Sequence, residues 1–190
     1  MTEPLHPLSW PLPSADIVGE LPDGSVLRMR APVRADIPGM VVSCRDEATQ
    51  EFTHMPENYT AADAEGFLRA MLHSPTAMLW IIDNPDDPGT FGGTLEVRLV
   101  DRSAYCVELG YTVAPHLRGR GLMTAVVSTV TEFLFDYRVH RVQLKANPAN
   151  VASCRVAEGA GFTREGTLRD AELLHGRFND LAIFSRIISD

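Results

Sequence analysis

Two arginines and two glycines stand together in the segment VAPHLRGRGLM, residues 113–123. Arg118, Gly119, Arg120 and Gly121 follow an apolar run typical of a strand and precede a run with helical spacing. A tight loop that leads into a helix presents unpaired main-chain N–H groups and the positive end of the helix dipole. Glycines let a ligand approach that main chain closely. The segment therefore predicts a local positive spot that binds an anion, and phosphate fits it best. The alternative is two solvated arginines at the start of a helix.

One carboxylate lies close to this loop in sequence. Glu108 belongs to the run AYCVELGYTV, residues 104–113, which has the alternation of a strand. One face of that strand carries only small residues and Glu108, so a ligand has room there. Glu108 could act as a base, and it could equally orient a substrate or pair with an arginine.

The elements that must position these residues form a mixed α/β sandwich without internal repeats. The clearest helix starts after Gly121, where apolar residues recur at helical spacing up to Tyr137. Thr60 and Asn150 are expected to cap two other helices. The predicted order is β-α-α-β-β-β-α-β-α-β-β. Strands are predicted at 25–31, 76–83, 91–100, 104–113 and 140–146, and two final strands turn at His175 and Gly176. Helices are predicted at 33–46, 60–72, 121–137 and 151–160.

The length of 190 residues fits one domain, and 45% apolar with 22% charged residues is ordinary globular composition. The first two dozen residues are rich in proline, which removes backbone donors and disfavours helix. We therefore expect an extended N-terminal arm over 1–24 and a folded domain over 25–190.

Charge and cysteine content exclude several classes of protein. Acidic residues outnumber Lys and Arg by 25 to 17, so the net charge of −8 argues against nucleic acid and accommodates an amine substrate more easily. Cys44, Cys106 and Cys154 lack the spacing of a disulfide framework or a metal site. Neither a signal peptide nor a membrane span is visible, so we expect a soluble protein in the reducing cytoplasm.

The glycine loop differs from two familiar phosphate cradles. It lacks the Lys-Ser/Thr ending of a Walker loop and the third glycine of a dinucleotide-binding fingerprint. RGRGLM instead resembles the acetyl-CoA signature of the GNAT superfamily of N-acetyltransferases, Arg/Gln-x-x-Gly-x-Gly/Ala, with Met123 as a departure at the last position. From residue 104 onward, ELGYTV and NPANVASCRVAEGAGFTREGTLRDAELLHGRFNDLAIFSRI resemble the RimJ/RimL branch.

This resemblance implies a single GNAT-like domain: a central, mostly antiparallel sheet with a splayed parallel strand pair, flanked by about four helices. It also implies acetyl-CoA as the cofactor. Main-chain amides near Tyr111 and Val113 would hold the pantetheine arm. Asn150 would bond that arm through water, or only cap its helix. The pyrophosphate would lie on the loop formed by Arg118, Gly119, Arg120, Gly121 and Met123.

The same resemblance assigns catalytic roles. Glu172, in DAELLHG, would be the general base, directly or through water, and its competing interpretation is a solvated acid at a strand end. Many superfamily members protonate the departing thiolate with a tyrosine, but Ala157 stands at that position. Ser153 matches the serine proposed for this task in RimL-like enzymes, although a serine at a helix start can merely bond the backbone.

We therefore expect a cytoplasmic, acetyl-CoA-dependent N-acetyltransferase that acts directly on a primary amine. The acceptor would be a protein N-terminal α-amine or a small-molecule amine, and neither nucleic acid nor membrane is an expected partner. The alternative is a non-catalytic domain that senses acyl-CoA. An isologous homodimer is the default assembly for such domains.

Overall fold

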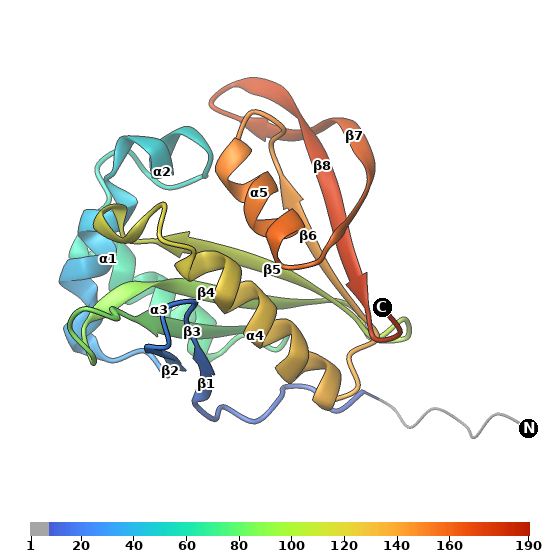
Figure 1. The fold of residues 1–190 in the computed structure, drawn as a ribbon. Coiled ribbons are helices and arrows are strands. Elements are labelled where there is room, and N and C mark those ends of the chain that lie inside the picture. Colours follow the sequence, from blue (N-terminus) through green and yellow to red (C-terminus); the bar gives the residue numbers. More distant parts are fainter. Residues whose placement is uncertain (1–7) are drawn as a thin grey trace, which may run out of the picture.

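The computed structural model describes residues 8–190, which form one eight-stranded sheet in the order β1-β2-β3-β4-β5-β6-β8-β7 (Figure 1). Every neighbouring pair is antiparallel except β5 and β6, which are parallel. The strands are β1 (Ile17–Glu20), β2 (Val26–Arg30), β3 (Ala77–Asp83), β4 (Phe91–Asp101), β5 (Cys106–Val113), β6 (Arg141–Ala146), β7 (Thr163–Leu174) and β8 (Arg177–Ile187). The helices are α1 (Ile37–Cys44), α2 (Glu47–Glu51), α3 (Ala61–Leu72), α4 (Leu122–Asp136) and α5 (Val151–Gly159), with short 3-10 turns η1 (Arg34–Asp36) and η2 (Pro115–Leu117).

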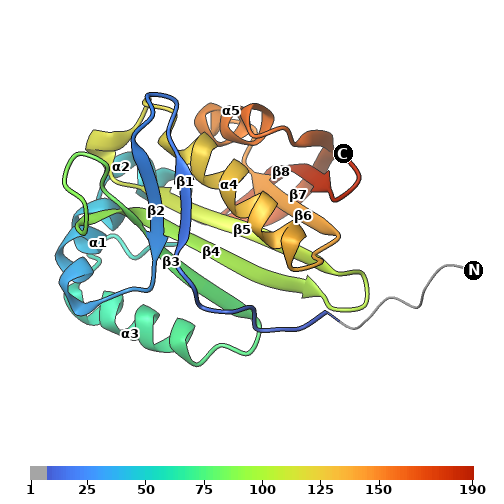
Figure 2. The same cartoon turned by 60° about the horizontal axis from the view of Figure 1, so that its bottom comes forward.

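Helices cover both faces of the sheet (Figures 1 and 2). The apolar stripe of α4, including Val126, Val130 and Leu134, is fully buried against β4 and β5 in the main core. Each such side chain contributes about 1.5–3 kcal/mol through burial. On the other face, α1 and α3 enclose a smaller cluster that includes Met40 and Tyr59. Alternation along β5 sends Val107 and Leu109 into the main core, and therefore turns Glu108 toward the α1 and α3 side.

The predicted fold class is confirmed, including the parallel strand pair. Pairing between β5 and β6 runs from Cys106↔Arg141 to Leu109↔Leu144 and stops there. Beyond that point β5 continues to Val113 along β4, and β6 continues to Ala146 along β8. The sheet is therefore open between the C-terminal ends of these two strands.

The N-terminal segment differs from the sequence-based expectation. Strand β1 pairs with β2, so the predicted boundary between residues 24 and 25 falls in the turn of a hairpin. Leu8, Trp10 and Leu12 are buried in the main core. The start of the folded domain is thus corrected to a point before β1, because apolar side chains between the prolines bury against the sheet. Residues 1–7 of the predicted arm lie outside the described residues.

The helix predicted over 33–46 is shorter than expected. Pro38 stands in the first turn of α1, where its missing N–H leaves no hydrogen bond unmade, so the Pro-Gly pair starts the helix instead of bending it. Sequence patterns also missed the short helix α2, which Asp46 caps by accepting a hydrogen bond from the Thr49 N–H. Five α-helices therefore occur in the described residues, against the four expected.

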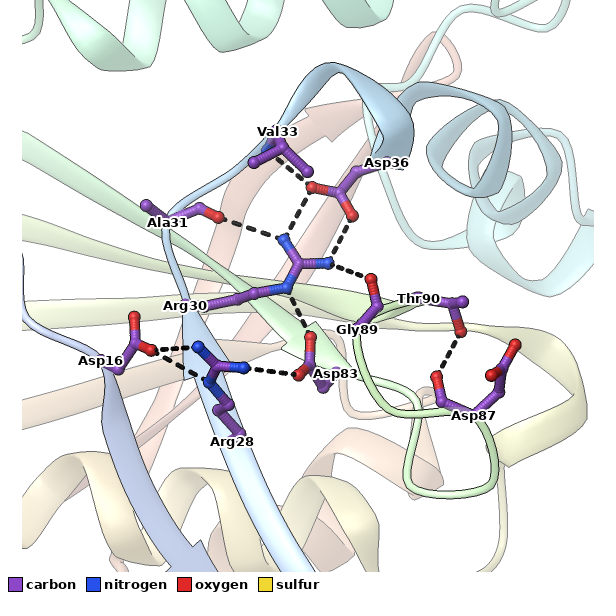
Figure 3. Close-up of polar contacts among 10 residues, drawn as sticks. All are labelled: Asp16, Arg28, Arg30, Ala31, Val33, Asp36, Asp83, Asp87, Gly89 and Thr90. Carbon is purple, nitrogen blue, oxygen red and sulfur yellow. Dashed lines mark hydrogen bonds and ion pairs between the residues drawn. The ribbon is translucent and has the colours of Figure 1, made fainter.

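A buried ion cluster joins β2, β3 and the start of α1 (Figure 3). The Arg30 side chain is 10% exposed, and those of its partners Asp36 and Asp83 are 2% and 6% exposed. Arg30 Nε donates to Asp83 at 2.6 Å, and its two terminal nitrogens donate to Asp36 at 2.7 and 3.0 Å. Those nitrogens also donate to the carbonyls of Ala31 and Gly89 at 3.1 Å. All five guanidinium donors are therefore satisfied. The hydrogen bonds to Asp36 raise the pKa of Arg30 above its ordinary value.

Candidate functional site

A cavity of about 310 Å³ opens where β5 and β6 separate. Gly110 and Thr112 of β5 and Lys145 of β6 line it. Ser153 of α5 lines it on one side of the sheet, and Met40 of α1 lines it on the other. Because helices from opposite faces share its walls, the cavity passes through the sheet at the opening between the two strands.

The main chain of β5 points hydrogen-bond donors into this opening. The Ala114 N–H donates to the Gly92 carbonyl at 2.9 Å. Antiparallel pairing alternates along a strand, so the Thr112 N–H also faces β4, and the N–H groups of Tyr111 and Val113 face the opposite side. On that side β6 no longer pairs with them. These donors need a partner, and a ligand in the opening could provide one.

The glycine loop has the backbone of an anion cradle. Gly119 and Gly121 have φ angles of 72° and 77°, which favour glycine, and Gly121 is the N-cap residue of α4. Gly121 has no side chain with which to cap the helix. A Cβ at Gly119 would meet no atom within 4 Å, so the loop is open beside it. Met123, the departure from the family signature, is buried in the main core, and only its main chain could face a ligand.

The two arginines of the loop are paired with aspartates. Arg118 donates to Thr49 Oγ1 at 2.9 Å and lies 2.6 Å from Asp46 Oδ2 in an ion pair. Burial opposes ionisation of Asp46, but Arg118 and Thr49 hold its pKa below the ordinary value. Arg120 pairs with Asp86 in the β3–β4 turn through both terminal nitrogens, one at 2.8 Å. The local positive spot expected from the sequence is therefore largely neutralised by these two aspartates.

Glu108 is the most heavily bonded carboxylate in the cavity wall. Its Oε2 accepts from Gln143 Nε2 at 2.9 Å and lies 2.9 Å from Lys145 Nζ. Its Oε1 accepts from Arg98 Nη2 at 3.3 Å. The Glu108 side chain is 15% exposed, and this burial raises its pKa, but the Lys145, Gln143 and Arg98 contacts outweigh burial and lower it below 4.5. A carboxylate with a lowered pKa is a weaker base than an unperturbed one.

Glu172 is a carboxylate of the cavity with few partners, as is Glu96, which lies 3.7 Å from Arg98 Nε. Glu172 lies near the end of β7, after a break in the register with β8 that follows Leu168. Its Oε1 is 3.3 Å from Nε2 of His54, in the loop between α2 and α3. The Glu172 side chain is 23% exposed, so it borders the cavity and solvent together. With one such contact it retains more free acceptor sites than Glu108, which has three contacts.

The remaining predicted residues meet on α5. Asn150 caps the helix, because its Oδ1 accepts from the Ser153 N–H at 3.0 Å. Asn150, Ser153 and Ala157 all line the cavity. Across it, the Tyr111 hydroxyl donates to the Ser153 carbonyl at 3.5 Å, and burial raises the pKa of Tyr111 to about 12. A phenol therefore lies within one helical turn of the position where Ala157 replaces the family tyrosine.

The three cysteines are free thiols. Cys44 lines the cavity, but burial raises its pKa to about 11, which leaves the thiol protonated at neutral pH. Residues 8–190 also contain no group of three or more His, Cys, Asp or Glu side chains that could hold a metal ion. None of the helices in this range combines the length and apolar character of a membrane span.

Sequence reasoning missed His54 and Lys145 as parts of the site. His54 showed no ligand spacing to another polar residue, and its partner Glu172 is more than a hundred residues away in the chain. Lys145 was seen only as part of a strand. The alternation of β6 places Lys145 on the same face as Gln143, and the pairing of β5 with β6 brings Gln143 beside Glu108. No local sequence signal could have revealed these contacts.

Comparison with known proteins gives a consistent picture. The model of the acetyltransferase (GNAT) domain matches residues 27–163. The uncharacterized N-acetyltransferase p20 of Bacillus licheniformis is 29% identical over 94 residues, which are 49% of this chain and 53% of that protein. The ribosomal protein uS5-alanine N-acetyltransferase of Escherichia coli K12 is 23% identical over 116 residues, 60% of each chain. The chain spans about half the length of the curated relatives that match it first.

The fold also matches a solved structure over nearly the whole chain. Mycobacterium smegmatis RimJ in complex with CoA-disulfide superimposes with a TM-score of 0.80. The match covers 96% of this chain and 90% of that chain at 20% sequence identity. At this identity the similarity shows a shared fold.

Proposed function

The chain belongs to the GNAT acetyltransferase family, and on that premise we propose that it is an acetyl-CoA-dependent N-acetyltransferase. It transfers the acetyl group directly to a primary amine. One observation carries this proposal: a single cavity, at the point where β5 and β6 separate, is lined by both Tyr111, whose N–H has no strand partner, and the Glu172 carboxylate. A donor thioester and an acceptor amine can therefore meet in the opening from opposite faces.

Acetyl-CoA fits the donor side of this opening. The N–H groups of Tyr111 and Val113 would pair with the pantetheine arm much as a neighbouring strand would. The main chain from Arg118 to Met123, with the N-terminus of α4, would hold the diphosphate, because its N–H groups and the helix dipole favour negative charge. The side chain of Arg118 joins them by leaving Asp46.

Glu172 is the general base of the proposed reaction. An amine can attack a thioester only when it is neutral, and at pH 7 this costs about 1 kcal/mol for an α-amine and about 4.6 kcal/mol for a lysine-type amine. Glu172 has acceptor sites open to the cavity, whereas three donors, Lys145, Gln143 and Arg98, already contact Glu108. Glu108 therefore orients these side chains on the acceptor wall.

Two hydroxyl groups are proposed to stabilise the departing thiolate. Ser153 is the proposed proton donor, because it lines the cavity on the α5 side. Tyr111 stands beside it with a phenol that stays protonated at neutral pH and can donate a hydrogen bond to developing negative charge. Both residues lie near Ala157, which stands at the position where many family members carry the tyrosine.

The acceptor class is a peptide α-amine or a small-molecule amine. Thiol release should be measured with acetyl-CoA and four amines: an alanine-first peptide, a serine-first peptide, spermidine and kanamycin. We expect at least one amine to stimulate release above hydrolysis. Tight acetyl-CoA binding without turnover of any amine would instead indicate a sensor domain.

The glycine loop is tested by cofactor affinity. Arg118→Gln removes a charge-assisted contact to phosphate, which is worth about 1.5–3 kcal/mol, so acetyl-CoA should bind about tenfold or more weakly by calorimetry. The matched control is Arg102→Gln, which changes an exposed arginine in the β4–β5 turn, at the far end of β5 from the opening. Equal affinities of the two variants would remove Arg118 from the phosphate site.

A further inference from the structure

The proposed reaction must discharge one proton to solvent. An ammonium acceptor becomes an amide by forming a C–N bond as the thioester C–S bond breaks, and it loses two protons on the way. One proton ends on the thiol of coenzyme A, and the other has no place in the products. A base that receives this second proton must pass it on before the next turnover.

We propose that His54 carries this proton from Glu172 to bulk water, and this inference rests on the function proposed above. His54 Nε2 lies 3.3 Å from Glu172 Oε1, within reach for a proton transfer. The His54 side chain is 65% exposed, against 23% for Glu172. Nε2 takes the proton from the Glu172 carboxyl while Nδ1 releases one to water. His54 is a positioning residue in this sense, because it acts through Glu172.

The loop that carries His54 is held in place by a second contact. His175, in the turn between β7 and β8, has its Nε2 2.8 Å from the Gln50 carbonyl of α2. This contact joins the same two segments as the His54 and Glu172 pair. The segment from α2 to α3 and the β7–β8 hairpin, far apart in sequence, therefore approach each other (Figure 1). Glu172 and His54 are thus held together by an interaction that does not depend on either of them.

No other ionisable group around the cavity is placed for this task among the described residues. Arg98 and Lys145 are cations bonded to Glu108, and these contacts lower the pKa of the Glu108 carboxyl. Burial raises the pKa of both Cys44 and Tyr59, so neither exchanges protons at neutral pH. The titratable and charged groups that face the cavity with His54 and Glu172 are Cys44, Tyr59, Glu96, Arg98, Glu108, Tyr111 and Lys145. Burial raises the pKa of Tyr111 as well, and Glu96 lies 3.7 Å from Arg98.

The test compares variants at His54 with a matched control at His140. His54→Gln keeps a hydrogen-bonding side chain beside Glu172 but cannot carry a proton, and His140→Gln changes an exposed histidine just before β6. With acetyl-CoA and the best amine of the panel, His54→Gln should lower kcat about tenfold, less than the loss of a direct general base. KM for the amine and affinity for acetyl-CoA should stay unchanged, and His140→Gln should match the wild type.

Chemical rescue separates a proton carrier from a structural residue. Added imidazole should restore kcat of His54→Ala in proportion to the neutral imidazole present, and should not restore Glu172→Gln. Wild-type kcat of His54→Gln across the pH range, with Glu172→Gln still impaired, would overturn the inference and leave the proposed function intact. Full activity of His54→Gln beside an impaired His54→Ala would also overturn it. Absence of turnover in the wild type would overturn the proposed function itself.

Discussion

Two groups of charged side chains in this protein, the Arg30 cluster and the carboxylates of the cavity, are built in opposite ways. The Arg30 cluster is buried, and each donor of its guanidinium has a protein acceptor (Figure 3). In the cavity, the ionisable partner of Glu172 is the exposed imidazole of His54. Its other acceptor sites face the cavity and solvent.

The difference shows how a carboxylate becomes available for chemistry. A buried charge is tolerated when its partners are complete, and a complete set of partners leaves nothing for a substrate. An exposed carboxylate needs fewer partners, so it can receive a proton or an ammonium. Glu108 lies between these cases: it borders the cavity as Glu172 does, but Lys145, Gln143 and Arg98 complete its contacts as in the Arg30 cluster.

The largest expected effect is on catalysis at Glu172. Glu172→Gln keeps the shape of the side chain but removes the base, so kcat should fall by about 10²–10⁴ while the free energy of unfolding stays the same. Steady-state kinetics and urea unfolding measure the two quantities. A variant with wild-type turnover over the whole pH range would transfer the base role to Glu108.

The Arg30 cluster should show the reverse behaviour. Arg30→Met leaves Asp36 buried without its cation and leaves Asp83 with only the longer contact to Arg28, at 3.8 Å, so the free energy of unfolding should fall by about 3–5 kcal/mol. Urea denaturation measures this loss, and Arg102→Met, an exposed arginine, is the control. If both variants are equally stable, the cluster does not hold β2, β3 and α1 together.

Glu108 should respond more as a structural group than as a base. Glu108→Gln presents an amide to Lys145 and Arg98, and we expect a loss of about 1–3 kcal/mol in the free energy of unfolding. The reduction in kcat should be much smaller than for Glu172→Gln in the same assay. A larger kcat loss at Glu108 than at Glu172 would reverse the comparison between the two carboxylates.

The smallest effect is a pH dependence of stability that belongs to Glu108. Because folding lowers the pKa of Glu108 below 4.5, its contribution is fully present above that pH. The contribution is lost as the pH falls below 4.5 and through the folded-state pKa. The stability difference between wild type and Glu108→Gln should therefore shrink on acidification, as urea unfolding at neutral pH and below 4.5 would show. A constant difference would mean that the bonds to Glu108 do not depend on its charge.

Much of the fold could be predicted because its elements carry local signals. Helical spacing after Gly121 predicted α4, and the capping residue Thr60 predicted α3, which the structure caps through Thr60 and Asp63. Short or partly polar elements carry weaker signals and were missed. Strand β1 lies among prolines and helix α2 has five residues, so neither has enough periodicity to stand out.

The site could be predicted only in part. The sequence pointed to Glu108, Glu172 and Ser153, and all three line one cavity. The sequence could not show which of these side chains is free to contact a substrate, because this depends on hydrogen-bond partners from other strands. Arg118 and Arg120 appeared as free cations in the sequence, and the aspartates that neutralise them come from the N-cap of α2 and from the β3–β4 turn.

By itself the sequence determined the glycine loop before a long amphipathic helix, the alternation of the strands and the family resemblance, since these depend on neighbours along the chain. Only the tertiary structure decided which carboxylates have few partners. The parallel pairing of β5 with β6 places Gln143 and Lys145 beside Glu108, and the approach of the loop before α3 to the end of β7 places His54 beside Glu172. Contacts between residues far apart in the chain set these charges, and no local pattern encodes them.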